Sequence, residues 1–253
     1  MTGRVSIIGL GPGGPEHTTP AASAALAAAT DLIGYGPYLD RVSAGPEQIK
    51  HPSDNRVEID RARAALDFAR AGRQVAIVSS GDSGVFAMAA TVFEAIEENQ
   101  ENYSDIDVDV VPGVTAMVAA AARLGAPLGH DFCAISLSDN LKPWETIVDR
   151  LEAVARAGFV IALYNPASKA RPWQLGKAFE ILRQILPADT PVAFATAVSR
   201  PDEKIVLATL GEANASCADM RTVVLIGSAA TRRLERSDKS SWLYTPRRAE
   251  ANS

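Results

Sequence analysis

Short apolar runs alternate with amphipathic segments along the first half of the chain. The runs are rich in β-branched residues and end at glycine or proline, which predicts strands over 5–10, 31–36, 74–82 and 106–113. The segments between them repeat apolar residues at helical spacing, which predicts helices over 19–30, 60–72 and 84–99. This alternation, with strands apolar on both faces, predicts a mostly parallel, doubly wound sheet.

Capping residues mark the ends of two of these helices. Thr19 followed by Pro20 fits the start of the first helix, because threonine caps and proline suits the first helical position. Asp60 is predicted to cap the next helix, and Gly72 stands where a glycine commonly ends one.

The second half of the chain shows the same elements less regularly. Strands are predicted over 132–139, 159–166, 191–198, 204–210 and 221–227, and helices over 113–129, 143–158 and 172–186. Helices become sparse toward the C-terminus, so this half is expected to carry a mixed sheet. We therefore predict two α/β domains, residues 1–112 and 113–253. The tail from Arg232 is polar, and its last few residues are expected to be loosely held.

Composition narrows the classes of function. A net charge of −5 and a pI near 5.3 do not suit non-specific binding of nucleic acid. Cys133 and Cys217 form no CxxC pair and the chain has 3 histidines, so we predict no metal site. No secretory signal and no membrane span is recognised, which predicts a cytoplasmic protein without a membrane partner.

Gly9, Gly11 and Gly14 spell G-x-G-x-x-G after the first strand, a pattern typical of nicotinamide and flavin enzymes. Two features of the context oppose that interpretation. The predicted helix starts at Thr19–Pro20, too late for its N-terminus to meet a pyrophosphate. Asp31 precedes its strand, so it is expected at the wrong end of the sheet to hold a ribose. A nicotinamide-dependent oxidoreductase therefore remains the weaker alternative, as does a plain turn without a ligand.

Three further strands end in turns like GLGPGG at 9–14. These turns are SGDSG at 80–84, PGVTA at 112–116 and YNP at 164–166. In open α/β sheets ligands bind beyond the carboxyl ends of the strands, and glycine there lets a ligand approach the backbone. Four successive turns of this kind predict a binding site at this edge.

The order of these motifs, together with RTVVLIG at 221–227, resembles the tetrapyrrole methyltransferases, which use S-adenosylmethionine. The resemblance runs from Val5 to about Arg233. The segments 34–40, 123–139, 143–147 and 164–171 are similar to the branch that methylates C17 of precorrin-3B and contracts the macrocycle to give precorrin-4. The resemblance implies an active site in a cleft between two α/β domains, a tetrapyrrole substrate and a homodimer.

Motif matching also implies which residues bind the cofactor. They are Pro12, Ser80, Gly81, Asp82, Val85, Thr115, Ala116, Tyr164, Asn165, Val198 and Gly227. Four positions depart from the pattern of the branch. Ser83 replaces a proline of the second turn, and Ala197 and Ser199 stand where asparagine and glycine are usual. Ser228 also replaces an asparagine common after the last glycine.

Methyl transfer from a sulfonium needs alignment more than acid–base help, but ring contraction calls for a base. The candidate catalytic residues are Asp139, His130, Tyr35 and Asp82, with Asp131 beside them. His130 could equally be a turn histidine. The substrate carries many carboxylates, so arginine and lysine in loops at strand ends are candidates to bind it. The predicted substrate-binding residues are Gly11, Gly13, Ser136, Lys142, Lys169, Arg171 and Arg200.

Three alternatives stay open. The substrate could be the cobalt-containing counterpart, cobalt-factor III. The chain could be a nicotinamide-dependent oxidoreductase with an unusual turn. It could also be a tetrapyrrole carrier that has lost its chemistry, although intact cofactor turns argue against that.

Overall fold

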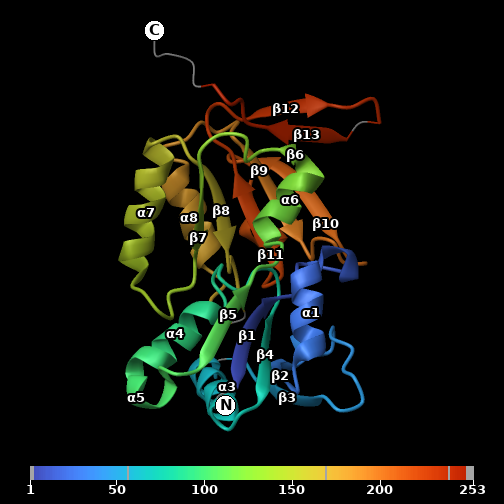
Figure 1. Ribbon diagram of the computed structural model, residues 1–253. Coiled ribbons are helices and arrows are strands. Elements are labelled where there is room, and N and C mark those ends of the chain that lie inside the picture. The colour runs from blue at the N-terminus through green and yellow to red at the C-terminus, as the bar shows by residue number, and fades with distance from the viewer. Residues whose placement is uncertain (1–2, 56, 169, 239, 249–253) are drawn as a thin grey trace. The chain divides into compact units, whose positions relative to one another are not determined.

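The computed structural model describes residues 3–248, apart from 56, 169 and 239. The chain divides into two compact units, Met1–Ala116 and Met117–Ser253, which we call unit 1 and unit 2. Each unit is an α/β structure built on its own five-stranded sheet (Figure 1).

The sheet of unit 1 is entirely parallel, with strand order β3-β2-β4-β1-β5. Its strands are β1 (Arg4–Gly9), β2 (Asp31–Tyr35), β3 (Ile49–Ser53), β4 (Gln74–Ser79) and β5 (Asp107–Val111). Its helices are α1 (Pro20–Ala28), α2 (Gly36–Leu39), α3 (Glu58–Arg70), α4 (Met88–Glu98) and α5 (Gln100–Tyr103), with a 3-10 turn at Pro15–His17. The predicted parallel sheet of the N-terminal half is confirmed.

Both faces of this sheet are buried. Val5, Ile7 and Ile77 point to one face and pack against α3 and α4. Ile8 and Val78 point to the other face and join α1 and the turn after α2. Successive residues of a strand point to opposite faces, so double coverage requires the continuous apolar runs seen in β1 and β4.

The start of α1 agrees with the cap predicted from the sequence, whereas the start of α3 does not. Thr19 caps α1, and its hydroxyl oxygen accepts from the Ala22 amide at 3.1 Å, as predicted. The predicted cap Asp60 is wrong, because α3 already begins at Glu58 and Asp60 lies in its first turn. There both acidic side chains lie near the positive end of the helix dipole, which also favours a helix start. Gly72 follows the helix with φ +88°.

β3 was not predicted from the sequence. Its residues Lys50, His51 and Pro52 break any apolar pattern, and it lies at the edge of the sheet, where proline is tolerated.

The main sheet of unit 2 is mixed, with strand order β10-β9-β11-β8-β7. β7 pairs parallel with β8, and the other pairs are antiparallel, as predicted for this half. The strands are β7 (Phe132–Ser136), β8 (Val160–Tyr164), β9 (Pro191–Thr196), β10 (Lys204–Thr209) and β11 (Thr222–Ile226). The helices are α6 (Ala116–Leu124), α7 (Trp144–Arg156) and α8 (Gln174–Leu182), with a 3-10 turn at Ala215–Cys217.

Strand direction decides which residues of unit 2 share an edge. The carboxyl ends of β7, β8 and β9 lie at one edge, together with the amino ends of β10 and β11. α7 and α8 pack on one face of this sheet, where Phe179 and Phe194 meet edge to face.

A second, three-stranded sheet in unit 2 was missed by the sequence interpretation. It joins β12 (Arg232–Glu235), β13 (Ser241–Tyr244) and β6 (Gly125–Ala126) in the order β12-β13-β6. The polar tail is therefore partly ordered in strands, while the residues predicted to be loose, 249–253, lie outside the described residues. In the described part of the chain, no helix combines the length and apolarity that crossing a membrane requires.

Candidate functional site

The glycine turns after β1 and β4 are joined by their backbones. The Gly11 amide donates to the Gly81 carbonyl at 3.0 Å, and the Gly81 amide donates back to Gly11 at 2.9 Å. Both residues adopt positive φ, +72° and +70°. Glycine takes this conformation without a steric cost, so these two positions require it.

The turn after β5 packs on the same pair. A Cβ atom at Gly113 would lie 2.3 Å from the Gly81 carbonyl oxygen, and one at Gly9 would lie 2.7 Å from it. Side chains at these positions would therefore separate the strands or deform the turns. The three turns together form a surface of closely packed main chain at the carboxyl edge of the sheet.

Asp82 holds these turns together. Its carboxylate accepts from the Gly84 amide at 2.8 Å and from the Gly113 amide at 2.9 Å. Beside it the buried Ser83 hydroxyl donates to the Val111 carbonyl at 3.1 Å, which gives a physical use for the serine that replaces proline. With both carboxylate oxygens on backbone amides, the geometry favours an anchoring role for Asp82 over that of a general base.

The remaining predicted residues of unit 1 lie at the same edge. Pro12 and Gly13 continue the β1 turn, Ser80 and Val85 belong to the β4 turn, and Thr115 and Ala116 follow the β5 turn. Tyr35 ends β2 and meets Tyr38 edge to face, with ring centroids 5.2 Å apart.

In unit 2, a polar cluster lies where β7 and β8 end. The Asn165 amide donates to the Ser136 hydroxyl at 2.9 Å. Arg171 Nη1 donates to the Ser138 hydroxyl at 3.1 Å and contacts Asp139 Oδ1 at 3.4 Å. The structure therefore brings the predicted residues Ser136, Asp139, Asn165 and Arg171 together.

Gln174, at the start of α8, belongs to this cluster and was missed. Its Nε2 donates to Asp139 Oδ1 at 3.2 Å, and the residue is 2% exposed. Its Oε1 is one of three buried side-chain atoms without a hydrogen-bond partner among the described residues. A buried acceptor left unpaired is costly, so Oε1 suits a donor brought by a ligand. No sequence pattern indicated Gln174, because α8 and β7 are far apart along the chain.

Tyr164 connects the end of β8 to the start of α6. Its hydroxyl oxygen accepts from the Met117 amide at 2.9 Å, which satisfies one of the unpaired N–H groups at the helix start. The next residue, Asn165, has φ +52°. Asparagine tolerates this left-handed conformation better than most residues.

The turn between β9 and β10 explains two departures from the family pattern. Ala197 and Ser199 have φ +50° and +63°, the region that favours asparagine and glycine. The Ser199 amide donates to Glu203 at 2.6 Å, which helps to hold the turn. Val198 is buried in this turn and Arg200 is half-buried at the same edge.

Two predicted residues are not brought to this edge. His130 precedes β7, at the opposite end of that strand from Asp139, and its Nδ1 accepts from the Asp131 amide at 2.7 Å. Gly227 follows β11, which runs antiparallel to β8, so it lies beside the start of β8 and away from Tyr164. A Cβ at Gly227 would lie 2.7 Å from the Thr231 side chain, which accounts for glycine there without a ligand. The roles of His130 and Gly227 at the site stay predictions, and the positions of the two residues disfavour them.

Of the predicted lysines, Lys142 is half-buried after β7. Burial, and then the charge of Arg150, lower the pKa of Lys142. Lys169 lies outside the described residues.

The objections to a nicotinamide site hold in the structure. α1 begins at Pro20, well after Gly14. Asp31 is the first residue of β2 and therefore lies at the amino edge, where it is fully buried beside Arg73 and His51.

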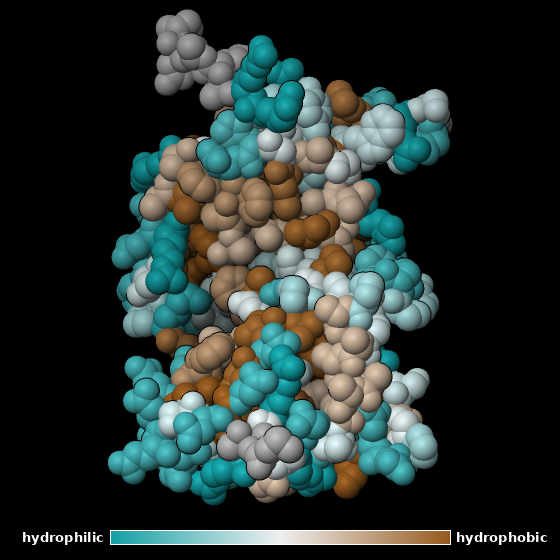
Figure 2. All heavy atoms as spheres, viewed as in Figure 1, coloured by the Kyte–Doolittle hydropathy of each residue, from teal (hydrophilic) through white to brown (hydrophobic). Residues whose placement is uncertain are grey.

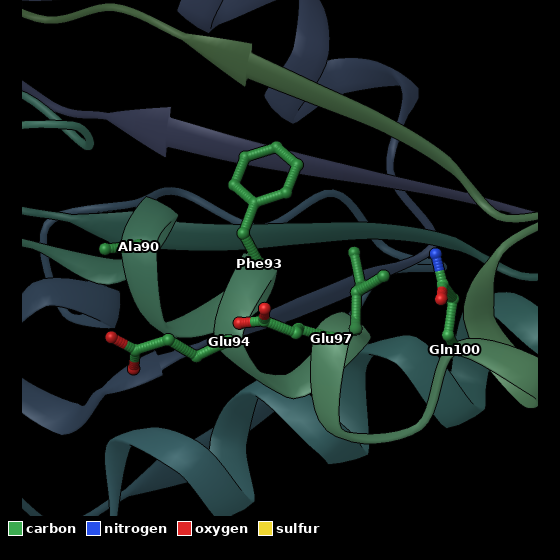
Figure 3. Close-up of a pocket in the computed structure, with 6 residues that line it drawn as sticks. Ala90, Phe93, Glu94, Glu97 and Gln100 are labelled. Carbon is green, nitrogen blue, oxygen red and sulfur yellow. The ribbon is translucent and has the colours of Figure 1, made fainter.

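A shallow pocket on the outer face of α4 contains none of the predicted residues (Figure 3). It is lined by Ala90, Phe93, Glu94, Ile96, Glu97 and Gln100. Hydrophobic residues show on the surface over α4 and β5 (Figure 2), where Phe93 and Val110 are exposed. Nothing in its chemistry points to catalysis.

The fold and the turns define an α/β protein of two units with glycine turns at strand ends. Residues 4–214 match the family model of the tetrapyrrole (corrin/porphyrin) methylases, and the chain belongs to that family. The resemblance seen in the motifs is thereby confirmed. That the active site lies in a cleft between the domains stays a prediction.

Individual relatives are similar over most of this chain. A precorrin-3B C(17)-methyltransferase from Sinorhizobium sp is 58% identical over 98% of this chain and 97% of its own. A probable cobalt-factor III C(17)-methyltransferase from Salmonella typhimurium is 42% identical, covering 90% and 93%. The chain aligns with 49% of the longer cobalamin biosynthesis protein CobIJ of Mycobacterium tuberculosis at 47% identity.

Solved structures show the same fold. The crystal structure of the methyltransferase CobJ has a TM-score of 0.92 and 51% identity, covering 97% of this chain and 100% of that one. Uroporphyrin-III C-methyl transferase from Thermus thermophilus, complexed with S-adenyl homocysteine, has a TM-score of 0.68 and 26% identity, covering 89% and 97%.

Proposed function

We propose that this chain transfers a methyl group from S-adenosylmethionine to C17 of precorrin-3B, with ring contraction to precorrin-4. The observation that carries the proposal is the 58% identity, along the whole chain, to a precorrin-3B C(17)-methyltransferase. The main-chain surface formed by the three turns of unit 1 supports it, because a zwitterionic cofactor with an adenine can be held by backbone groups.

The turns fit such a cofactor. S-adenosylmethionine supplies an electrophilic methyl group on a sulfonium sulfur. The chain's task is then to bind and align, which for well-oriented groups removes much of a reaction barrier. Gly113 lets the turns pack closely against each other, Gly81 leaves its own Cα face without a side chain, and Asp82 keeps the turns in register. Tyr164, Asn165 and Val198 are the proposed cofactor residues of unit 2.

Asp139 is the proposed base for ring contraction. It lies at the carboxyl edge of its sheet and is held by Gln174 at 3.2 Å and Arg171 at 3.4 Å. Arg171 contacts Ser138 and Asp139 through Nη1, so its other guanidinium edge can face a substrate carboxylate. Tyr35 remains a candidate, whereas the contacts of Asp82 and the position of His130 favour neither as the base.

The decisive experiment supplies both substrates to the purified protein. Incubation with S-adenosylmethionine and precorrin-3B is expected to add the mass of one methyl group and to change the absorption spectrum. Omitting the methyl donor is the control. No incorporation, in a mixture where a known relative is active, would reject the proposal.

Cobalt-factor III is the second candidate substrate, favoured by the 42% identical Salmonella relative. The higher identity to the precorrin-3B enzyme makes the metal-free substrate the first choice. Parallel assays with both substrates decide, and a higher kcat/KM for cobalt-factor III would reverse the order.

The cofactor can be tested without a tetrapyrrole. S-adenosylhomocysteine is expected to raise the melting temperature, because a ligand that binds only the folded state stabilises it. Stabilisation by NAD or NADP alone would favour the oxidoreductase. A pigmented protein without turnover would favour a carrier. We also place the enzyme in the cytoplasm as a homodimer, and sedimentation of the full chain tests the dimer.

A further inference from the structure

Arg41 lies in the turn after α2, and its position is fixed by its neighbours. The Arg41 amide donates to the Tyr38 carbonyl and the Val42 amide to the Leu39 carbonyl, both at 3.1 Å. Leu39 and Val42 are buried in the apolar cluster that also contains Ile8 and Val78, from β1 and β4. The backbone of Arg41 is therefore tied to the two strands whose turns form the glycine surface.

The guanidinium group of Arg41 bonds to both turns. Nη2 donates to the carbonyl oxygens of Gly11 at 2.9 Å and Gly13 at 2.8 Å, with the Leu10 carbonyl at 3.4 Å. Nη1 donates to the Ser80 hydroxyl at 3.0 Å. One side chain thus gathers acceptors from the β1 turn and from the β4 turn.

These bonds also set the direction of the peptide planes. In a trans peptide the carbonyl and the following N–H point to opposite sides. With the Leu10 carbonyl facing Arg41, the Gly11 amide faces away from it, which is where it meets the Gly81 carbonyl at 3.0 Å. With the Gly13 carbonyl facing Arg41, the Gly14 amide also points away. Arg41 therefore fixes the orientation of the main-chain groups of the turn as well as the position of the turn.

No other side-chain type supplies these contacts. A guanidinium is planar, carries five N–H donors in a fixed fork and stays charged. Lysine has one ammonium on a flexible stem, which cannot keep two turns in a fixed relation.

We propose that Arg41 is the positioning residue of the methyl-donor site, holding the β1 and β4 turns in the geometry that binds S-adenosylmethionine. The proposal deepens the proposed function and rests on it. Arg41 acts through Gly11, Gly13 and Ser80, so its loss should weaken cofactor binding more than it slows the chemistry.

The first experiment needs no ligand. Hydrogen exchange of the full chain compares wild type with Arg41→Ala and with the control Arg63→Ala, an exposed arginine that pairs with Glu98 at 2.7 Å. Peptides that contain Gly11 and Gly81 are expected to exchange at least ~10-fold faster in Arg41→Ala only, because weakly held backbone opens locally. Unchanged exchange would overturn the proposal.

The second experiment measures S-adenosylhomocysteine binding by calorimetry. Arg41→Ala is expected to raise Kd by about 10- to 100-fold, as misplacement of binding groups commonly does. Millimolar guanidinium should restore part of the affinity, and Arg41→Lys should lie between the two. In turnover, KM for S-adenosylmethionine should rise while kcat changes far less. An unchanged Kd, or a loss that guanidinium does not reduce, would overturn the assignment.

The two experiments separate this proposal from the proposed function. If wild type fails to bind S-adenosylhomocysteine, the proposed function is wrong, while exchange still reports whether Arg41 orders the turns. If Arg41→Ala does not fold, Arg41→Lys is carried through both measurements, with Arg63→Lys as its control.

Discussion

The turns at the carboxyl ends of the strands differ in kind between the two units. In unit 1 the left-handed positions of the β1 and β4 turns are glycines, Gly11 and Gly81. In unit 2 the corresponding turns place Asn165, Ala197 and Ser199 in the same region of φ. Phe86, with φ +51°, is an exception in unit 1.

The difference teaches what each edge can offer. Glycine turns expose main-chain groups and pack closely, so unit 1 presents a backbone surface. The turns of unit 2 carry strain and lie beside a cluster of hydroxyl, amide, carboxylate and guanidinium groups. Strained backbone often gathers at functional sites. The proposed division therefore gives cofactor binding mainly to unit 1, and acid–base and carboxylate contacts to unit 2.

The largest effect is expected at Gly113. A methyl group in Gly113→Ala would lie 2.3 Å from the Gly81 carbonyl oxygen. We expect the free energy of unfolding to fall by about 3 kcal/mol and cofactor binding to be lost. Thermal unfolding and calorimetry measure both. Gly36→Ala is the matched control, because no atom lies within 4 Å of its Cβ. If the two variants have equal unfolding free energies and equal cofactor affinities, the three turns of unit 1 are not closely packed.

Two aspartates give the sharpest contrast between the units. Asp139→Asn should lower kcat by about 100-fold or more, with little change in stability, because it removes the proposed base. Asp82→Asn should instead cost about 2 kcal/mol of stability, since its NH2 group would face either the Gly84 or the Gly113 amide and leave that donor without an acceptor. Steady-state kinetics and denaturant unfolding measure these effects. The opposite outcome, an inactive but stable Asp82→Asn, would move the base to unit 1.

The strain in unit 2 can be relieved at Ser199. Because φ is +63°, Ser199→Gly is expected to raise the free energy of unfolding by up to about 1 kcal/mol, or a few degrees in Tm. Ala195→Gly, in the buried strand β9, should lower Tm and serves as control. If Ser199→Gly also lowers Tm, the turn is held by contacts stronger than its backbone cost.

The smallest effect concerns the thiols. Burial raises the pKa of Cys133 to about 11, so at pH 8 it stays a neutral thiol. Cys217 is exposed. A thiol reagent on the folded protein should therefore modify Cys217 quickly and the partly buried Cys133 much more slowly, without loss of stability or activity. Equal rates at the two cysteines would show that the β7 region opens readily.

The sequence predicts local features of this molecule well. Thr19 and Pro20 mark the start of α1, and the glycine turns mark strand ends, because each depends on neighbouring residues. β3 escapes prediction because Lys50, His51 and Pro52 show no apolar pattern.

Site residues that depend on strand direction or on distant contacts could not be predicted in the same way. Gly227 ends a strand like the others, yet β11 runs antiparallel to β8 and carries it to the opposite edge. Gln174 and Arg41 reach the site through contacts with residues far along the chain. The ends of predicted strands therefore indicate the residues that share an edge in a parallel sheet, but not in a mixed sheet, where strand direction is unknown.

The short edge strand β3 has a consequence for how the protein behaves at high concentration. An open sheet edge invites a strand from a neighbouring molecule to extend it. Pro52 has no N–H to donate to such a strand, and the neighbouring Lys50 and His51 disfavour its approach by charge and bulk. At the other edge, Asp107 and Asp109 of β5 pair with Arg4 and leave that border charged. Because both edges carry residues that oppose strand addition, the sheet of unit 1 resists ordered aggregation. This resistance matters most while the sheet forms, since parallel sheets form slowly.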